Sequence, residues 1–348
     1  MLPELETICP VEVVPLVRSK LRQCSDLLTS LLAGKSFIIE RDYRPAMLSA
    51  VRKATEHFQP DVIHVDHLQM ARFVEFGGSY RVVLDHHNFE SMIIKRVGET
   101  AGSIATRMYA RLEWPKLLRY ELDVCRRCDL VLTVSEEDKA AIRAVDPSIQ
   151  NIECVPIGVD VEHYQPVKRM EGSRKILHTG TMYWPPNVDA MLYFAREILP
   201  LIKQKIPECT LTIAGQRPVE AIRALARDPS ISVTGYVEDD RAIAADCGVF
   251  VVPLRSGSGV RVKILNALAM GLPVVATSVG AEGLEVVHGE HLLIADAAQD
   301  LADAVVEVLS DPELAASLGF NGRKLVCEKY SWERVGERLL AVYSRFES

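Results

Sequence analysis

The sequence predicts an α/β protein with two Rossmann-like, doubly wound domains. A chain of 348 residues is too long for one ordinary core and suits two domains. Short β-branched runs alternate with helical patterns along both halves, as in parallel sheets covered by helices. Residues 250–277 show the pattern most clearly, as a strand, a glycine loop, a helix and a second strand. Two such domains facing each other across a cleft are the simplest architecture.

The composition is that of an ordinary soluble globular protein and excludes several classes. Hydrophobic residues make up 48% of the chain and charged residues 25%. The net charge of -7 argues against a nucleic-acid partner. No apolar run approaches the roughly 20 residues of a membrane span, and the start, MLPELETICP, lacks the pattern of a signal peptide. We therefore expect a cytoplasmic protein.

The cysteines indicate packing in a reducing compartment. The chain has 8 cysteines scattered along its length. Cys125 and Cys128 are one helical turn apart, but no second pair or histidine stands at the spacing of a metal site. Helix packing is therefore favoured over a metal or redox role for this pair.

The first half begins with helical patterns and continues into a sheet. Residues 16–58 are predicted helical, with an interruption near residues 34–36. A further helical region, residues 101–127, contains a predicted break at Trp114-Pro115. Strands are predicted at residues 62–65, from residue 81 onward, and at residues 130–134.

The middle of the chain contains a predicted helix cap and a predicted linker. Ser135 is predicted to cap the helix that follows it, with Asp138 reaching back. Residues 163–175 are polar and aperiodic, which predicts a linker between domains. We therefore place the first domain at residues 1–165 and the second at residues 166–331. The second half alternates more regularly, with strands predicted at residues 175–178, 210–214, 231–234, 249–252, 274–277 and 292–294.

The glycine loop of the second half predicts an anion site. The loop Ser256-Gly257-Ser258-Gly259 precedes a helix whose first N–H groups and dipole favour negative charge. Arg261 and Lys263 stand at the same place, and glycines let a ligand approach the backbone closely. We expect a phosphate to bind here. The alternative is a tight turn with two solvated cations.

Several motifs, taken together and in order, resemble one enzyme family. They are DVIHVDH, VVLDHHNFES, CDLVLTVSEED, VPIGVD, TIAG, TGYVED, VPLRSGSGVRVKILNALAMGLPVVAT, VGAEGL and EKYSWERVGERLLAVY. This series is similar to the retaining GT-B glycosyltransferases of family GT4. The resemblance implies transfer of a sugar from a nucleotide-sugar donor to a glycan, lipid-linked or other acceptor. It places the donor in the second domain and the acceptor in the first, and it implies neither a metal nor a cofactor.

The resemblance also implies roles for individual residues. His87 is the expected contact to the transferred sugar, with His86 as the alternative. Arg261 and Lys263 are expected to hold the diphosphate and stabilise its charge as it leaves. The other expected donor-binding residues are Gly180, Thr181, Gly257, Ser258, Gly259, Val260, Asn266 and Glu282.

The chain departs from the family pattern at several positions. Ser258 and Asn266 stand where the family usually has two glutamates, and Asn266 offers the ribose no charge-assisted bond. The family's Arg and Lys after Gly180 are missing, so their role is given to Arg261 and Lys263. The leading strand and its glycine-rich loop are also missing, so we expect the first sheet to lack that strand. Residues 332–348 are expected to form a helix that crosses back to the first domain.

Other functions remain open at this point. Asn266 and the missing start favour a degenerate GT-B protein that binds a nucleotide or a partner without turnover. A GT-B nucleotide-sugar epimerase is a third candidate function. A peripheral contact with the inner face of the cytoplasmic membrane is also expected, through a basic surface with apolar neighbours. The candidate residues of this surface are Lys95, Arg96, Arg107, Arg111, Lys116 and Arg119. The alternative is that they form a solvated helix face without a membrane contact.

Overall fold

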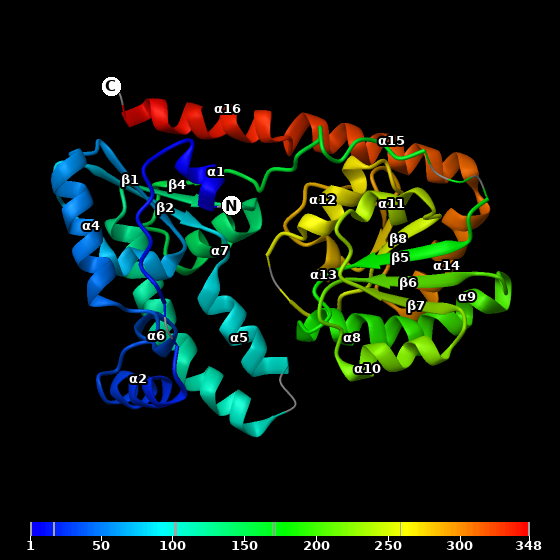
Figure 1. Ribbon diagram of the computed structural model, residues 1–348, viewed down its shortest axis with the longest axis horizontal. Coiled ribbons are helices and arrows are strands. Elements are labelled where there is room, and N and C mark those ends of the chain that lie inside the picture. Colours follow the sequence, from blue (N-terminus) through cyan, green and yellow to red (C-terminus); the bar gives the residue numbers. More distant parts are fainter. Residues whose placement is uncertain are drawn as a thin grey trace. The chain divides into compact units, whose positions relative to one another are not determined.

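The computed structural model shows two compact units, Met1–Cys154 and Val155–Ser348, each with its own parallel sheet (Figure 1). The residues that it describes are 2–16, 18–100, 103–168, 170, 172–257 and 259–346. Each unit buries its own hydrophobic core. The predicted α/β class with two parallel-sheet domains is confirmed.

The first unit is built on a four-stranded parallel sheet in the order β1-β2-β3-β4. Its strands are β1 (Val62–Asp66), β2 (Arg81–His86), β3 (Leu130–Thr133) and β4 (Ile152–Cys154). The central strands β2 and β3 are almost fully buried, which explains their continuous apolar runs. In a parallel sheet the carboxyl ends of the strands share one edge, so the polar residues after β1 and β2 meet there.

The helices of the first unit agree with most of the sequence patterns. They are α1 (Leu2–Glu6), α2 (Lys20–Leu32), α3 (Phe37–Glu40), α4 (Pro45–Phe58), η1 (Leu68–Phe73), α5 (Glu90–Thr100), α6 (Ile104–Arg127) and α7 (Glu136–Val145). The predicted interruption near residues 34–36 lies between α2 and α3. Ser135 caps α7, where its hydroxyl accepts a hydrogen bond from the Asp138 N–H at 3.1 Å, as predicted.

One sequence prediction about this unit is wrong. Helix α6 does not break at Trp114-Pro115 but continues through it to Arg127. Glu113 and Leu117 are buried on either side of the proline, so packing fixes both halves of the helix and outweighs the loss of one backbone hydrogen bond. The pair Cys125 and Cys128 is buried and free, with the pKa of Cys128 raised to about 12 by burial, in agreement with a packing role.

The second unit is built on a six-stranded parallel sheet in the order β10-β9-β8-β5-β6-β7. Its strands are β5 (Lys175–Thr179), β6 (Thr210–Ala214), β7 (Ile231–Gly235), β8 (Val249–Val252), β9 (Val274–Ala276) and β10 (Leu293–Ile294). The chain enters at β5 in the interior and reaches both edges by crossovers, as in a doubly wound sheet. Helices surround the strands (Figure 1).

The helices of the second unit lie between these strands in the chain, as far as α13, and after the last strand, from α14 onward. They are α8 (Pro185–Tyr193), η2 (Phe194–Ile198), α9 (Leu199–Lys205), α10 (Glu220–Arg223), η3 (Ala224–Arg227), α11 (Asp240–Ala245), α12 (Val262–Ala269), α13 (Ser278–Ala281), α14 (Ala298–Ser310), α15 (Pro312–Lys329), α16 (Trp332–Tyr343) and η4 (Ser344–Phe346). Strand β8, the loop after it, α12 and β9 reproduce the predicted unit of residues 250–277.

The division of the chain differs from the expected boundary at residue 165 and from the expected place of residues 332–348. Residues from Val155 onward, α16 included, group with the second unit. The reason is local pairing: the Val159 N–H donates to the Tyr330 carbonyl at 2.7 Å, and the Trp332 N–H donates to the Val159 carbonyl at 3.2 Å. The start of α16 is therefore tied to the segment that was expected to belong to the first domain.

Candidate active site

The glycine loop after β8 contacts the side chain of Arg261, which follows it in the chain. Gly257 and Gly259 have φ angles of +129° and +80°, in the region that favours glycine. The Arg261 guanidinium donates to the Gly259 carbonyl at 2.8 Å, and a Cβ at Gly257 would lie 2.7 Å from its Nη2 atom. Gly257 thus leaves space for the guanidinium of Arg261. Val260 packs against the core, and the predicted donor residue Ser258 lies outside the described residues.

Lys263 is held at the carboxyl edge of the sheet by two neutral acceptors. Its ammonium donates to Asn187 Oδ1 at 3.0 Å and to His178 Nε2 at 3.3 Å. His178 Nδ1 lies 2.8 Å from the Val251 carbonyl, which can only accept, so Nδ1 carries the proton and Nε2 is free to accept from the lysine. Both His178 and Asn187 are buried. Three elements, β5, α8 and α12, therefore fix one ammonium group.

Gly180 provides the space in which the ammonium lies. It follows β5 directly, and a Cβ there would lie 2.6 Å from Lys263 Nζ and 2.9 Å from Asn187 Nδ2. The next residue, Thr181, accepts a hydrogen bond from Asn187 Nδ2 at 3.1 Å through its carbonyl. The expected donor residues Gly180, Thr181 and Lys263 are thus brought together. The sequence analysis did not predict that His178 and Asn187 belong to this site. The signals that could have indicated them are a histidine near the end of a strand and an asparagine after Pro185-Pro186.

The surroundings of Lys263 favour its neutral form over its charged form when no ligand is bound. Burial lowers the pKa of Lys263 to about 7, and the positive charge of Arg261 adds to the effect. Burial, together with the charge of Lys263, also holds the pKa of His178 well below its usual range. Since each pKa unit corresponds to about 1.4 kcal/mol, charging this lysine costs several kcal/mol. A bound anion would offset that cost.

We expect nucleotide-sugar binding to weaken as pH rises above neutrality. Because the free protein has a Lys263 pKa of about 7 and a bound diphosphate raises it, binding takes up a proton. The affinity is then constant well below pH 7 and falls above it, by up to about tenfold per pH unit. Titrations of one nucleotide-sugar at several pH values measure this slope. The Lys263→Arg variant, whose side chain stays charged, should show a flat profile; a wild-type profile that is equally flat would contradict the assignment.

We also expect Gly180→Ala to weaken donor binding and to strain the turn after β5, because the φ angle of +159° at this position disfavours a side chain. The added methyl group would meet the end of Lys263, a flexible side chain, and push its ammonium away from Asn187. Loss of one charge-assisted contact predicts a reduction of affinity of about tenfold or more. Calorimetric titration measures it, with Gly336→Ala as the control, because a Cβ there meets open space. Unchanged affinity in Gly180→Ala would show that the ammonium does not contact the donor.

The remaining donor-site predictions lie along the same edge of the sheet. Asn266 is on α12, one turn beyond Lys263, and is half-buried. Glu282 is half-buried and directly follows α13, the short helix after β9. Thr277 caps α13, where its hydroxyl accepts a hydrogen bond from the Gly280 N–H at 3.0 Å. Since β5, β8 and β9 are parallel, their carboxyl ends place these residues on one side.

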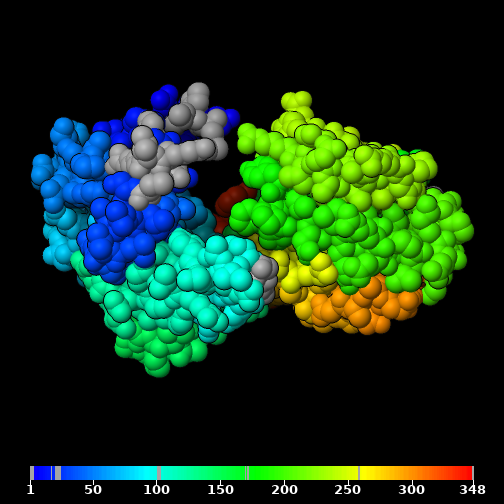
Figure 2. Space-filling view, turned by 90° about the horizontal axis from the view of Figure 1, so that it is seen from below, coloured from blue at the N-terminus to red at the C-terminus, as the bar shows by residue number. Residues whose placement is uncertain are grey.

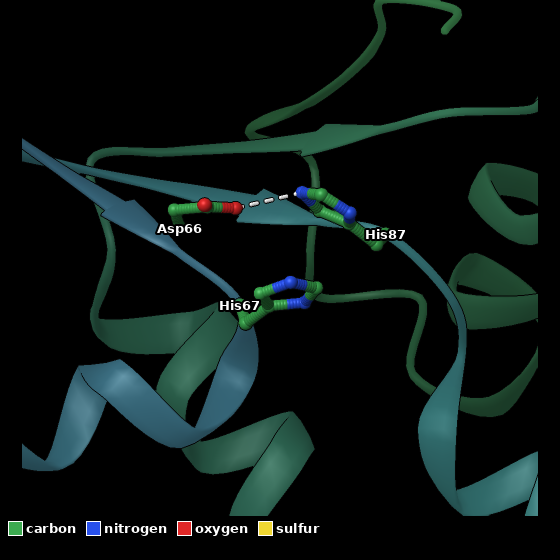
Figure 3. A group of neighbouring side chains, drawn as sticks. All are labelled: Asp66, His67 and His87. Carbon is green, nitrogen blue, oxygen red and sulfur yellow. Dashed lines mark ion pairs between the residues drawn. The ribbon is translucent and has the colours of Figure 1, made fainter. Parts of the chain in front are cut away.

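In the first unit, His87 lies at the corresponding edge beside a second histidine and an aspartate (Figure 3). Its Nε2 atom is 2.8 Å from Asp66 Oδ1, at the end of β1, and its side chain is 33% exposed. The ring of His67 faces that of His87, with a centroid separation of 4.0 Å. Asp66 and Asp85 pair in the register of β1 and β2, which brings the two strand ends together.

His86, the alternative to His87, has a structural environment. It is buried, and its Nε2 atom donates to Glu121 Oε1 at 2.8 Å. Glu121 also accepts from the backbone N–H groups of Glu90 and Ser91, at the start of α5. Burial alone would lower the pKa of His86, but the hydrogen bond and charge of Glu121 outweigh it, and the pKa is raised. His86 therefore joins β2 to α5 and α6.

A cavity of about 620 Å³ in the first unit borders the residues beside His87. Asp66 and His67 form part of its wall, together with Arg18 and Arg44. Most of the remaining wall is apolar, with Val14, Leu16, Met47, Val51, Ile63, Val65, Met70, Phe73 and Val74. The first unit thus offers a space for a ligand next to the Asp66–His87 pair.

Comparison with known families identifies both halves of the chain. Residues 173–311 match the family model described as "Glycosyl transferases group 1", and residues 35–163 match "Glycosyltransferase Family 4". The chain is 29% identical over 235 residues to a GDP-mannose-dependent alpha-(1-6)-phosphatidylinositol monomannoside mannosyltransferase of Mycobacterium tuberculosis, with 61% of this chain and 60% of that one covered. It is 24% identical to an uncharacterised 44.6 kDa protein in the cps region of Klebsiella pneumoniae, with 72% and 65% covered. The chain thus spans less than two thirds of the length of these relatives.

Solved structures of other proteins share the fold of this chain. Sucrose-phosphate synthase from Thermosynechococcus elongatus superposes with a TM-score of 0.68 at 19% identity, with 86% of this chain and 77% of that chain covered. HepE from Anabaena, in complex with UDP, superposes with a TM-score of 0.65 at 15% identity, with 86% and 82% covered. These likenesses show the GT-B fold, and the two family models, which match both units, show that the chain belongs to the family 4, group 1 glycosyltransferases.

Proposed function

We propose that this protein is a glycosyltransferase that moves a sugar from a nucleotide-sugar donor to an acceptor, with retention of anomeric configuration. The observation that carries the proposal is the cationic site at the start of α12, where Lys263 and Arg261 stand beside the glycine loop. Departure of the nucleoside diphosphate builds negative charge on its phosphate. Fixed cations and helix N–H groups stabilise such charge without having to reorganise.

The names of related proteins support the classes of donor and acceptor. The mycobacterial relative is named as GDP-mannose-dependent and as acting on a phosphatidylinositol mannoside. HepE has been solved with UDP-glucose. We therefore propose a nucleoside diphosphate hexose as the donor and a glycan or lipid-linked molecule as the acceptor. The acceptor would bind in the first unit, where the cavity of about 620 Å³ borders Asp66 and His67.

The proposed mechanism needs neither a carboxylate pair nor a metal. The acceptor hydroxyl attacks the anomeric carbon on the face from which the diphosphate leaves, and a leaving phosphate oxygen takes the hydroxyl proton. Lys263 and Arg261 would neutralise the diphosphate in place of a metal ion, and His87 would contact the sugar. No cofactor is involved, because the activated sugar brings its own leaving group.

The experiment is release of nucleoside diphosphate from a panel of nucleotide-sugars, measured with and without candidate acceptors. Acceptor-dependent release, with an NMR spectrum of the product showing the donor's anomeric configuration, supports the proposal. Activity that persists in EDTA supports metal independence. Conversion of the donor without an acceptor would identify an epimerase. Tight binding without turnover would identify a degenerate protein, the alternative that the loss of a glutamate at Asn266 favours.

Helix α6 supports a peripheral contact with the inner face of the cytoplasmic membrane. No helix in the described part of the chain is long and apolar enough to cross a bilayer. However, α6 exposes one apolar stripe, in which Ile104, Met108 and Leu112 are 70%, 60% and 58% exposed. Arg107 and Arg111 are exposed beside the stripe. Helices α5 and α6 form a broad part of the surface in Figure 2, in cyan and green.

Lys95 and Lys116, which were expected on this surface, are among the residues with partners within the protein. Lys95 lies over the ring of Trp114, 5.6 Å from its centroid. Lys116 pairs with Glu113 at 3.1 Å. Arg107, Arg111 and Arg119 are exposed. An apolar stripe flanked by arginines fits the headgroup region of anionic lipid, where side chains insert and cations meet phosphates.

We expect the triple variant Ile104→Ser, Met108→Ser and Leu112→Ser to lose binding to anionic vesicles. Removing three apolar side chains from the lipid contact predicts a decrease in partitioning of about tenfold or more. Co-sedimentation with phosphatidylglycerol vesicles measures it. Phe320→Ser is the control, because Phe320 is 72% exposed on α15 of the other unit. Equal binding of the triple variant and the wild type would exclude the stripe as the contact.

A further inference from the structure

The cluster of Asp66, His67 and His87 has the side chains of a transition-metal site. One ligand atom from each residue lies within 4.8 Å of the other two. Asp66 and His67 come from the end of β1 and His87 from the end of β2 (Figure 3). We infer that these three residues bind a divalent transition metal ion, with Zn²⁺ as the best match.

The separations suit a shared ion after small side-chain rotations. Ligand atoms about 2.0–2.2 Å from Zn²⁺ in a tetrahedral arrangement lie roughly 3.3 Å from one another. His87 Nε2 and Asp66 Oδ1 are already 2.8 Å apart. The rings of His67 and His87 face each other, with 4.0 Å between centroids and an interplanar angle of 37°. Rotation of the His67 ring about its side-chain bonds would bring a nitrogen to the ion that the other two residues share.

The backbone holds these ligands in place. His67 has a φ angle of +72°, which is uncommon for any residue but glycine. Its N–H donates to the Asp85 carbonyl at 3.2 Å, so the strained residue is tied to the neighbouring strand. Asp66 is held by the register of β1 against β2. The ligands therefore stand on strand ends rather than on a long loop, which lowers the ordering cost of binding.

The donor set and the local charge select the kind of ion. Two imidazoles and one carboxylate suit Zn²⁺ and neighbouring transition metals, whereas Mg²⁺ and Ca²⁺ prefer oxygen ligands. A second carboxylate, Asp85, lies 3.8 Å from His87 Nε2 and adds negative charge close to the site. The side chain of Asp66 is 65% exposed, which leaves room for water to complete the coordination.

The sequence alone gave no sign of this site and predicted no metal. Asp66-His67 and His87 are far apart in the chain, and no short motif with ligand spacing contains them all. Only the parallel pairing of β1 and β2 brings them to one edge. The site stands apart from the proposed phosphate chemistry, which belongs to Lys263 and Arg261. Because it includes His87, an ion bound there would compete with the proposed sugar contact, so Zn²⁺ should inhibit transfer.

The test is direct metal binding to the full chain, with no activity readout required. Zn²⁺ is titrated by calorimetry, and Co²⁺ is titrated while its visible d–d absorption is recorded. Cys9, an exposed thiol, is replaced by serine in every sample to remove a competing ligand. The variants are His67→Asn and His87→Ala, each of which removes one imidazole ligand. His57→Ala is the control, since His57 is an exposed histidine on α4 of the same unit.

The expected result is one Zn²⁺ per chain, with affinity reduced about tenfold or more in both ligand variants and unchanged in His57→Ala. The Co²⁺ band should weaken in parallel. Circular dichroism of each variant shows whether the fold is retained, and retention in either one suffices for the comparison. The inference would be overturned if the wild type showed no saturable Zn²⁺ binding. It would also be overturned if His67→Asn and His87→Ala both bound Zn²⁺ as tightly as the wild type. Either result would leave the proposed transfer reaction untouched.

Discussion

Replacement of both Arg261 and Lys263 by alanine is expected to weaken nucleotide-sugar binding by about 100-fold or more. Hydrogen bonds to charged groups contribute about 1.5–3 kcal/mol each, and the double variant removes both cations at the start of α12. The ammonium of Lys263, held by Asn187 and His178, should account for the larger share because its position is fixed before the ligand arrives. Calorimetric titration with a panel of nucleotide-sugars measures the loss and identifies the nucleotide.

The controls for this prediction separate charge from structure. Lys324→Ala removes an exposed lysine on α15 and should leave the affinity unchanged. Lys263→Arg keeps a cation and should retain part of the affinity. If the double variant binds the donor as tightly as the wild type, the diphosphate does not lie at the glycine loop, and the donor site must be sought elsewhere.

Glu121→Ala is expected to reduce the free energy of unfolding by about 3–5 kcal/mol, the usual cost of breaking a buried ion pair. Glu121 is 0% exposed and accepts hydrogen bonds from His86 and from the first N–H groups of α5. Alanine would leave all of these donors buried without their acceptor. Urea denaturation followed by circular dichroism measures the change. Glu99→Ala, at an exposed position on α5, is the control and should stay within about 0.5 kcal/mol of the wild type.

The pH dependence of stability provides an independent check on this pair. The pKa of His86 is raised in the folded protein, because pairing with Glu121 outweighs the opposing effect of burial. Such a group stabilises the fold fully below its unfolded pKa of about 6.5, and the contribution is lost as pH rises through the folded value. The difference between wild type and Glu121→Ala should therefore be larger at acidic than at alkaline pH. A difference that grows with pH would contradict the pairing.

The sequence predicted the donor side of the molecule in most respects, because its signals are local. Glycine loops, caps and β-branched runs determine the backbone over a few residues, and the unit from β8 to β9 is built from such signals. His178 and Asn187 escaped prediction because their roles depend on which strands become neighbours. Nothing in the sequence around His178 shows that β5 lies beside β8. That strand pairing brings the Val251 carbonyl within hydrogen-bond distance of His178 Nδ1.

The first unit was less predictable because its important contacts are long-range. The motif Asp85-His86-His87-Asn88 marked a functional strand end, but the sequence could not say which histidine faces inward. Alternation along β2 buries His86, and Glu121 of α6 meets it there. In the same way, the break predicted at Pro115 failed because packing of α6 overrides a local preference.

Proton uptake when a nucleotide-sugar binds near pH 7 tests most directly whether Lys263 meets the diphosphate. Titrations in two buffers of different ionisation enthalpy measure it, since protons taken up by the protein come from the buffer. We predict that binding takes up part of a proton in the wild type, because Lys263 has a pKa of about 7 when the site is empty and becomes fully charged against the diphosphate. We predict no uptake in Lys263→Arg. Binding with the same enthalpy in both buffers would show that Lys263 does not meet the diphosphate, and would contradict the assignment of the donor site.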